Sequence, residues 1–317
     1  MISVSASILV SALIFQHCGR NQLRALKKLV SRKRIRSTAL PYKLYYFNYI
    51  PNFGDALNLD LIDFMGQRYE IGNEETANII GVGSLLQHFV SDQPVDINPK
   101  LETLHICGSG FIQARTEPGY FVRNVEVHAL RGKLSLEIAE NILGRKLPGV
   151  ALGDPGLLLS RVFPADDAPK KYAVGIILHY VDRESQAFWN IKFKNLNFKI
   201  INISVRPKQV AKEISECEFI LSSALHGLVA ADSYGIPNRW IRLSDDIVGG
   251  DFKFKDYYSA FDIDTDDIKP VDLRKYEIFD EDIDVFKAVY KKRTKKIDEI
   301  CKALIKTFPV FPDTSKK

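Results

Sequence analysis

A serine pair and a histidine share one turn of this chain, in a setting that suits anion binding. Residues 218–243 begin with a short apolar run that stops at Ser222 and Ser223, and His226 and Gly227 follow. The apolar spacing predicts a strand, a tight turn, a helix and a second strand. The polar residues then lie at the helix N-terminus, where free backbone N–H groups and the helix dipole favour an anion. The alternative is structural, with serines that cap the helix and a packed His226.

Two further predicted strands end in glycine-rich turns. Residues 79–84 and 104–110 each join an apolar run to a Gly-x-Gly-Ser or Gly-Ser-Gly sequence, and neither is a GxGxxG motif or a P-loop. Glycine lets the backbone come close to a ligand. The candidate ligand contacts in these turns are Gly83, Ser84, Gly108, Ser109 and Gly110.

Basic side chains follow three other predicted strands. They are Arg131, Lys133, His179 and Arg206. Arginine can hold a carboxylate or a phosphate with two donors, whereas a surface salt bridge is the alternative for an isolated arginine. Because ligands of open α/β sheets bind outside the carboxyl ends of the strands, we expect these side chains near a ligand.

Amide and carboxylate side chains lie in two other turns. Asn52, Gly54, Asp55 and Asn58 stand where the first predicted strand gives way to a helix, and Asp154 stands in a later turn. Asn52 and Asp55 are also good helix caps, which is their alternative role. We expect Asn52, Gly54 and Asn58 to contact a substrate, and Asp55 and Asp154 to contact it or to act as a base.

Strand and helix signals alternate along the chain, which indicates an α/β fold with parallel sheets. The polar segment at residues 161–171 divides two such halves. We expect two Rossmann-like domains with mostly parallel sheets that face a cleft. The predicted divisions are a basic segment at 1–40, an N-terminal α/β domain at 41–165, a C-terminal α/β domain at 172–262, and an acidic linker with a single C-terminal helix (residues 285–305) at 263–317.

Charge and cysteine content narrow the class of protein. The chain has 317 residues and a net charge of +5, and residues 20–36 hold eight Lys or Arg and no acid. The rest carries 36 basic residues, the 44 in total less these eight, against 39 acidic ones, so a nucleic-acid surface is not expected. Four widely spaced cysteines fit neither a zinc site nor a disulfide framework and indicate a reducing, cytoplasmic setting. No metal-ligand cluster stands out.

The N-terminal segment has two interpretations. Residues 2–15 are apolar but too few to span a bilayer, and the positive charge follows them instead of preceding them as in a secretory signal. Leucines alternate with the basic residues of 20–36, which fits an interfacial helix in peripheral contact with an anionic membrane. An ordinary first helix or a tail is the alternative.

Several motifs occur together in the order found in the polysaccharide pyruvyltransferase family, which the chain resembles from about residue 42 to residue 260. No single motif is decisive. They are NFGDALN at 52–58, GVGS at 81–84, CGSGF at 107–111, LRGKLS at 130–135, LGDP at 152–155, SSALHGLVAADSYGIP at 222–237 and GGDFKFKDYYS at 249–259.

The resemblance implies a fold and an activity. Family members transfer the enolpyruvyl unit of phosphoenolpyruvate onto a sugar of a polysaccharide or of its lipid-linked precursor, forming a pyruvate ketal, and resemble the GT-B glycosyltransferase architecture. The resemblance places Arg131 and His226 at the phosphoenolpyruvate site. Many members have arginine where this chain has Ala224. We expect Arg206 to supply that charge.

The residues fit such a reaction. Phosphoenolpyruvate is strongly anionic, and ketal formation needs an acid for its methylene carbon and a base for a sugar hydroxyl. His226 is the expected acid because its ordinary pKa is nearest neutrality, and Asp55 and Asp154 are expected to contact the sugar or to act as the base. The chemistry calls for no metal and no cofactor besides the donor. The alternatives are a nucleotide-sugar glycosyltransferase of the same architecture and a non-catalytic sugar-binding protein of polysaccharide assembly.

Overall fold

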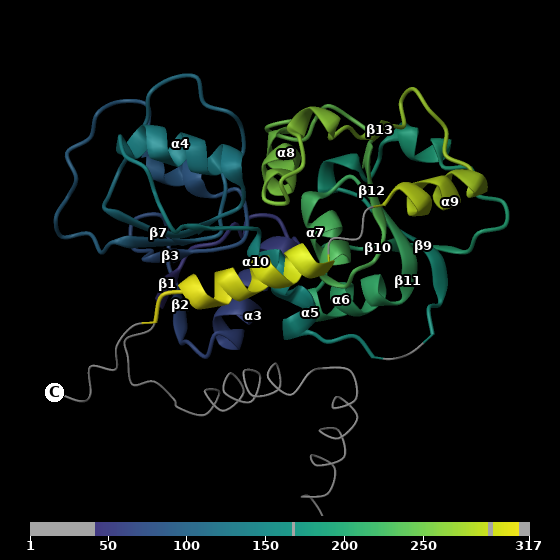
Figure 1. Cartoon of the computed structure of the whole chain (residues 1–317), viewed down its shortest axis with the longest axis horizontal. Helices are drawn as coiled ribbons and strands as arrows, with labels where there is room; N and C mark the ends of the chain where they lie inside the picture. The colour runs from purple at the N-terminus through teal and green to yellow at the C-terminus, as the bar shows by residue number, and fades with distance from the viewer. Residues whose placement is uncertain (1–41, 167–168, 291–293, 311–317) are drawn as a thin grey trace, which may run out of the picture.

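Two parallel β-sheets, side by side, organise the protein (Figure 1). A computed structural model describes residues 42–166, 169–290 and 294–310. The expected membrane-binding segment at 20–36, like the whole of 1–40, lies outside these residues. Among the helices that the structure describes, none combines the length and the apolar character needed to cross a bilayer.

The first sheet has six strands in the order β2-β1-β3-β5-β7-β8, all parallel. Helix α4 covers one face, and α3 and α10 cover the other (Figure 1). We call this sheet with its helices the N-terminal lobe. Its elements are β1 (Tyr42–Leu44), α3 (Phe53–Phe64), β2 (Tyr69–Ile71), β3 (Ile79–Ile80), η3 (Leu86–Phe89), β5 (Leu104–Cys107), β7 (Val125–Leu130), α4 (Lys133–Leu143), β8 (Ala151–Leu152), η4 (Pro155–Leu158), α5 (Leu159–Val162) and α10 (Thr294–Thr307), with a separate antiparallel pair, β4 (Val90–Ser91) and β6 (Tyr120–Phe121).

The second sheet has five parallel strands in the order β10-β9-β11-β12-β13. Helices α6 and α7 pack on one face and α9 on the other. We call this sheet with its helices the C-terminal lobe. Its elements are β9 (Tyr172–Ile177), η5 (Tyr180–Asp182), η6 (Gln186–Asn190), β10 (Phe198–Ile201), α6 (Pro207–Ser215), β11 (Cys217–Ser222), α7 (Leu225–Ser233), β12 (Asn238–Arg242), α8 (Phe252–Ser259), η7 (Thr265–Asp267), β13 (Val271–Asp272) and α9 (Asp280–Val289).

The apolar runs of the sequence explain both sheets. In β9, for example, Val174 and Ile176 pack against the α9 side, while Ile177 packs against the α6 and α7 side. Strands buried on both faces are the rule in parallel sheets. The predicted α/β class with parallel sheets is therefore confirmed.

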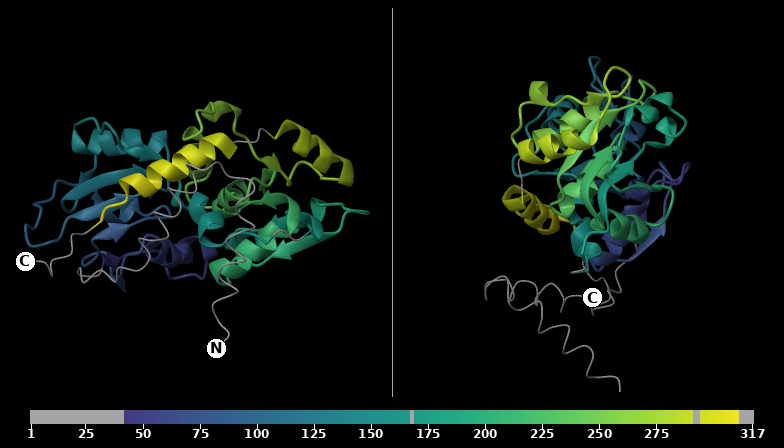
Figure 2. Two further views of the ribbon diagram at one scale, coloured as in Figure 1. Left: turned by 60° about the horizontal axis from the view of Figure 1, so that its bottom comes forward. Right: turned by 90° about the vertical axis from the view of Figure 1, so that its right-hand side faces the viewer.

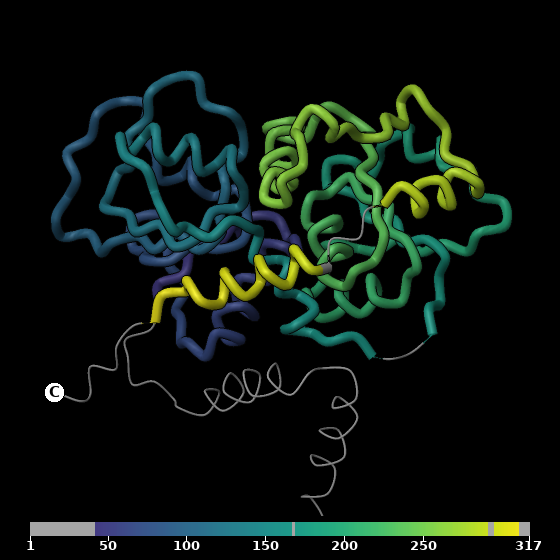
Figure 3. Tube along the Cα trace, in the orientation of Figure 1, coloured from purple at the N-terminus to yellow at the C-terminus, as the bar shows by residue number. Residues whose placement is uncertain are grey.

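A shared apolar core joins the lobes. One cluster of buried side chains runs from α3 and η4 through α7 to α8 and α10, and includes Leu57, Leu157, Leu228 and Ile300. Helix α10 crosses the junction on one side (Figure 2). The trace in Figure 3 shows α8 approaching the N-terminal lobe on the other side. The lobes are therefore held together at two places.

The C-terminal part of the chain differs from the prediction. The predicted single helix at residues 285–305 is two helices, α9 and α10. Val285 and Val289 are exposed, whereas Ile297 and Ile300 are buried against the rest of the protein. The apolar spacing runs on across the break between the helices, so periodicity alone does not reveal it. The segment predicted to be an irregular linker also contributes a strand, β13.

Candidate active site

His226 lies where the first turns of two helices meet. It is the second residue of α7, and its ring packs against the backbone of Gly54, the second residue of α3. A Cβ atom on Gly54 would lie 1.9 Å from Nδ1 of His226, so this close approach requires glycine. The ring also meets the edge of Phe53, with centroids 6.5 Å apart. Two helix N-termini, one from each lobe, thus converge on one place, which favours an anion there.

The imidazole of His226 is neutral at pH 7 in this structure. Burial, and then the positive charges of Lys253 and Arg131, lower its pKa to about 3. Its Nε2 atom is buried and has no hydrogen-bond partner among the described residues. A buried polar atom without a partner is destabilising, typically by about 1–3 kcal/mol. A ligand that accepts or donates a hydrogen bond here would remove that penalty.

Lys253 is a residue that the sequence analysis missed. It lies in the first turn of α8, and its Nζ lies 5.8 Å from the ring centroid of its neighbour Phe254. Burial and the charge of Arg131 lower its pKa to about 8, against the opposing effect of Asp55 and Asp182. No hydrogen bond joins its ammonium group to the part of the chain that the structure describes. The signal was present in the motif at 249–259, from which no residue was selected.

Two buried carboxyl groups complete this group of side chains. Burial raises the pKa of Asp55 to about 7, with Asp154 adding to the shift and Lys253 opposing it. Burial likewise raises the pKa of Asp154 to about 6. Its Oδ1 accepts a hydrogen bond from the backbone N–H of Gly156 at 2.8 Å, while Oδ2 is buried and has no partner among the described residues. Both groups can therefore exchange protons near neutral pH.

His179 lies close enough to His226 to lower its pKa. It is buried, and burial followed by the charge of Lys253 lowers its own pKa to about 3. We name the five side chains of Asp55, Asp154, His179, His226 and Lys253 the junction cluster. They come from both lobes. Asp55, Asp154, His179 and Lys253 each influence the pKa of another member, and His179 and Lys253 lower that of His226.

Arg131 borders the junction cluster but is held by the protein itself. Its guanidinium is fully buried and donates from Nε to Asp256 at 2.9 Å, from Nη1 to Ser84 at 2.7 Å, and from Nη2 to the carbonyl oxygen of Phe111. Asp256 lies on α8, so the ion pair joins the two lobes. Each Nη nitrogen carries two N–H groups and has one described protein partner. The expected contact of Arg131 with a ligand stays a prediction.

The glycine-rich turns pack against Arg131 and other protein groups. Ser109 donates its hydroxyl to the carbonyl oxygen of Gly83 at 2.9 Å and so joins the turns after β3 and β5. A Cβ on Gly110 would lie 2.5 Å from Cζ of Arg131, and one on Gly108 would lie 2.3 Å from Pro155. In this structure the close backbone approach that glycine permits is to other protein groups.

The serines after β11 shape the turn into α7. Ser222 accepts from the backbone N–H of Ala224 at 3.1 Å, and Ser223 accepts from the backbone N–H of His179 at 2.9 Å. A Cβ on Gly227 would lie 2.3 Å from the hydroxyl of Ser222. Both serines are fully buried. Their contacts are within the protein, but neither serine caps α7, whose N-cap residue is Ala224 with no side-chain cap hydrogen bond.

Three other candidates form contacts within the protein. Asn52 caps α3 by accepting from Gly54, and Asn58 bonds both backbone groups of Val82. Lys133 is exposed and pairs with Asp262 at 2.7 Å. These contacts hold α3, the turn after β3 and the α4–α8 contact in place.

The structure does not support Arg206 as a substitute for the arginine missing at Ala224. Arg206 is exposed and lines a surface pocket with Asn52, Ala56, Asp60 and other residues on one face of α3. Asp55 points from another face of that helix, toward the junction cluster. The first turns of α3 therefore separate Arg206 from the cluster. The sequence placed Arg206 at a strand end but could not show on which side of α3 that end lies.

Comparisons with known proteins agree with the motifs. The family model described as "Polysaccharide pyruvyl transferase" matches residues 24–245. The chain is 32% identical over 170 residues to the uncharacterised protein L143 of Acanthamoeba polyphaga mimivirus, covering 52% of this chain and 57% of the relative. It is 24% identical over 217 residues to the succinoglycan biosynthesis protein ExoV of Rhizobium meliloti (strain 1021), covering 68% and 63%.

These matches span less than two thirds of the length of either curated relative. A crystal structure of an uncharacterised protein from Klebsiella pneumoniae subsp. pneumoniae NTUH-K2044 aligns with a TM-score of 0.40 and 11% identity, covering 76% of this chain and 94% of that chain.

Proposed function

This chain belongs to the polysaccharide pyruvyl transferase family, and we propose that it transfers the enolpyruvyl group of phosphoenolpyruvate onto a sugar of a polysaccharide or of its lipid-linked precursor. The observation that carries the proposal is the junction cluster. It combines the ammonium of Lys253, an imidazole nitrogen that is buried without a partner among the described residues, and two protonatable carboxyl groups, at a point where two helix N-termini meet. The printed name of ExoV, a succinoglycan biosynthesis protein, supports a polysaccharide acceptor.

Lys253 and His226 bind the phosphate in this proposal. The ammonium of Lys253 supplies positive charge, and the backbone N–H groups at the start of α3 and α7 supply donors. The imidazole of His226, which is neutral in the ligand-free protein, donates a hydrogen bond to the phosphate. Arg131 contacts the carboxylate or phosphate through the remaining N–H groups of Nη1 and Nη2 while Asp256 holds its Nε.

A bound anion also changes the protonation of the neighbouring acid groups. A negative charge raises the pKa of neighbouring carboxyl and imidazole groups. Asp55, whose pKa is already about 7, then carries a proton at neutral pH. In the ligand-free protein it is a better proton donor than His226, whose pKa is about 3. His226 becomes protonated only when phosphate lies beside it.

The proposed reaction has two steps. An acid protonates the methylene carbon of phosphoenolpyruvate, and a first sugar hydroxyl adds to the adjacent carbon and gives its proton to a base. The bond from that carbon to the phosphate oxygen then breaks, and phosphate leaves with the electron pair. A second hydroxyl adds to the same carbon and loses its proton to phosphate, which yields the cyclic ketal. Asp55 and Asp154 are the proposed acid and base, and His226 steadies the leaving phosphate.

Substrate entry requires the junction to open in this account. Asp55, Asp154, His179 and the Nε2 atom of His226 are buried, and the Arg131–Asp256 pair closes the α4–α8 side. We propose a GT-B-like arrangement in which the lobes separate on that side while the apolar core beside α10 stays packed. A lipid-linked acceptor would suit a cytoplasmic enzyme in peripheral membrane contact through residues 20–36. A chain shortened by residues 1–36 should then lose co-sedimentation with anionic liposomes and keep activity on a soluble acceptor.

A transfer assay tests the function directly. Purified protein is incubated with phosphoenolpyruvate and a panel of free and lipid-linked sugars, and phosphate release is followed together with the ketal methyl signal in proton NMR. The proposal requires both signals to depend on an acceptor and on His226. Stabilisation against heat by a nucleotide-sugar, with none by phosphoenolpyruvate, would instead indicate a glycosyltransferase. Stabilisation by glycan alone would indicate a sugar-binding protein.

A further inference from the structure

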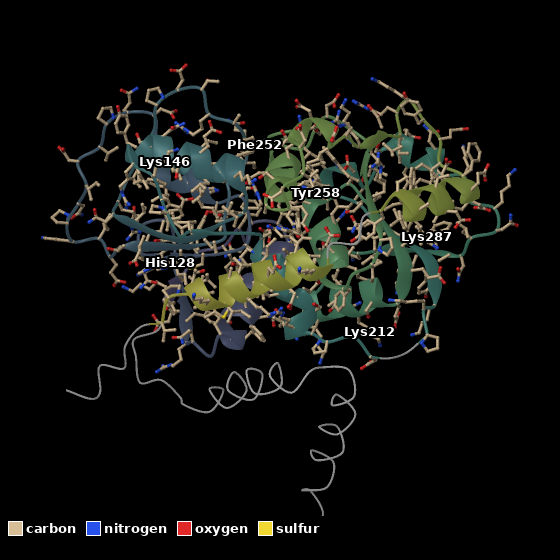
Figure 4. All side chains as sticks on the ribbon, in the orientation of Figure 1. His128, Lys146, Lys212, Phe252, Tyr258 and Lys287 are labelled. Atoms are coloured by element: carbon tan, nitrogen blue, oxygen red, sulfur yellow. The ribbon has the colours of Figure 1, made fainter. Side chains whose placement is uncertain are left out.

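Two histidines and a glutamate meet on the first sheet, inside the strands and not at their ends. His105 lies on β5, and Glu126 and His128 lie on β7. His128 (labelled in Figure 4) lies on the side of the sheet that α10 covers, where it lines a pocket with Leu304. None of the three belongs to the junction cluster.

The strand geometry explains how they meet. Glu126 and His128 are two residues apart on β7, so their side chains point to the same face. His105 is paired with Glu126 across the sheet, and the register shifts between Ile106 and Cys107, next to His128. Such a bulge redirects the neighbouring side chain. Because these ligands come from two strands, their spacing along the sequence does not match a known metal-binding motif.

The distances between the donor atoms match a bound metal ion. Nδ1 of His105 lies 2.9 Å from Nε2 of His128. The carboxylate oxygens of Glu126 lie 3.6 Å from His105 Nδ1 and 3.8 Å from His128 Nε2. Two ligand atoms of a tetrahedral zinc ion are roughly 3.3 Å apart, given zinc–nitrogen bonds of about 2.0–2.1 Å. Shifts of a few tenths of an ångström would therefore bring all three onto one ion.

The environment of the three side chains also suits a metal. The histidine side chains are 12% and 15% exposed, and that of Glu126 is 60% exposed, so the site is shielded on one side and open on the other. Two imidazoles and one carboxylate are typical ligands of zinc and related divalent metals. Three protein ligands leave a fourth position for water.

We propose that His105, Glu126 and His128 bind a first-row divalent transition metal, with Zn²⁺ as the probe ion. The ion would clamp β5 to β7 at the register shift. The same two strands lead to Ser109 and Arg131. The metal would therefore make the part of the N-terminal lobe that carries these two residues more rigid. The proposal is independent of the pyruvyl transfer reaction and assigns the metal no step in it.

Titration of the full-length, chelator-treated protein with Zn²⁺ in a calorimeter tests the site. We expect one ion per chain and a higher melting temperature in its presence. His128→Ala and Glu126→Gln should each weaken binding by at least about 10-fold, because loss of even an indirect partner of a metal site weakens affinity by about 10- to 100-fold. Glu126 is largely exposed, so Glu126→Gln should fold even if His128→Ala does not.

Two variants serve as matched controls. His88 pairs with Glu74 at 2.8 Å, and the part of the chain that the structure describes offers this pair no third ligand. His88→Ala should therefore keep wild-type affinity. Cys18→Ser should also keep it, because the three proposed ligands do not include Cys18. Wild-type affinity in Glu126→Gln, loss of binding in Cys18→Ser, or no zinc bound by the wild type would each overturn the proposal.

Discussion

The two sides of the lobe junction differ in how completely their buried polar atoms are hydrogen-bonded. On the α4–α8 side, Arg131 and Asp256 are fully buried and their polar atoms are matched by Ser84, Ser135 and a backbone carbonyl. In the junction cluster, Nε2 of His226 and Oδ2 of Asp154 are buried with no partner among the described residues. Arg131 and His226 both follow strand ends, and sequence spacing alone gives them the same appearance.

The difference separates a structural polar network from a binding site. A buried charge is tolerated when its hydrogen bonds are complete, and removal of one partner is then strongly destabilising. Incomplete hydrogen bonding is unfavourable in the empty protein and becomes favourable only with a ligand. Arg131 should therefore matter first for stability, and His226 and Lys253 first for binding and turnover.

The largest expected effect is on catalysis by His226. His226→Ala should lower turnover by about 100- to 10,000-fold, the range for loss of a positioned acid–base group, with little loss of stability. His226→Asn can still donate a hydrogen bond but cannot titrate. Steady-state kinetics on both variants distinguish the roles: recovery with Asn means that His226 holds phosphate, and continued loss means that it transfers a proton.

The second prediction concerns the satisfied side of the junction. Asp256→Ala leaves the guanidinium of Arg131 buried without its counter-ion and should lower the free energy of unfolding by about 3–5 kcal/mol. The matched control is Lys133→Ala, which breaks an exposed pair between the start of α4 and Asp262, just after α8, and should cost at most about 1 kcal/mol. Chemical denaturation measures both. Equal effects would show that the buried network is not special.

The third prediction uses the raised pKa of Asp55. In the folded protein this pKa is about 7, against an ordinary value of 3.8. Between these values the folded state keeps a proton that the unfolded state has lost, so stability from this group falls as pH rises. Relative to Asp55→Asn, the wild type should lose roughly 2–3 kcal/mol between pH 5 and pH 8. Parallel pH dependences of the two proteins would mean that Asp55 is ionised like an exposed carboxylate.

The smallest expected effect is at Arg206. Because Arg206 is exposed on another side of α3, Arg206→Ala should change stability by no more than about 0.5 kcal/mol. It should also leave the Michaelis constant for phosphoenolpyruvate unchanged. A large increase in the Michaelis constant would instead indicate that Arg206 binds phosphoenolpyruvate.

Sequence patterns predicted the sheets well because parallel strands are apolar on both faces. Residues 125–130, for example, were predicted as a strand and form β7. The helix break after α9 and the side of α3 on which Arg206 lies depend on packing between distant segments. No local pattern in the sequence encodes those contacts.

The candidate site could be predicted from the sequence only in part, because local patterns do not show which distant residues contact each other. Strand ends and the helix start pointed to His226, Asp55 and Asp154, and the structure places these three side chains in one region. Whether a side chain there is satisfied depends on partners far along the chain, such as Asp256 for Arg131, 125 residues away. Lys253 comes from a helix after the second sheet and not from a strand end, so the strand-end rule passed over it.

Binding of phosphoenolpyruvate to Lys253 variants tests the central claim most directly. Titration calorimetry compares the wild type with Lys253→Met and with Lys255→Met, which removes a half-buried lysine from the same helix. The account predicts that Lys253→Met weakens binding by at least about 10-fold, the equivalent of about 1.4 kcal/mol, and that Lys255→Met binds like the wild type. Equal affinity in all three proteins would contradict the assignment of the junction cluster as the donor site.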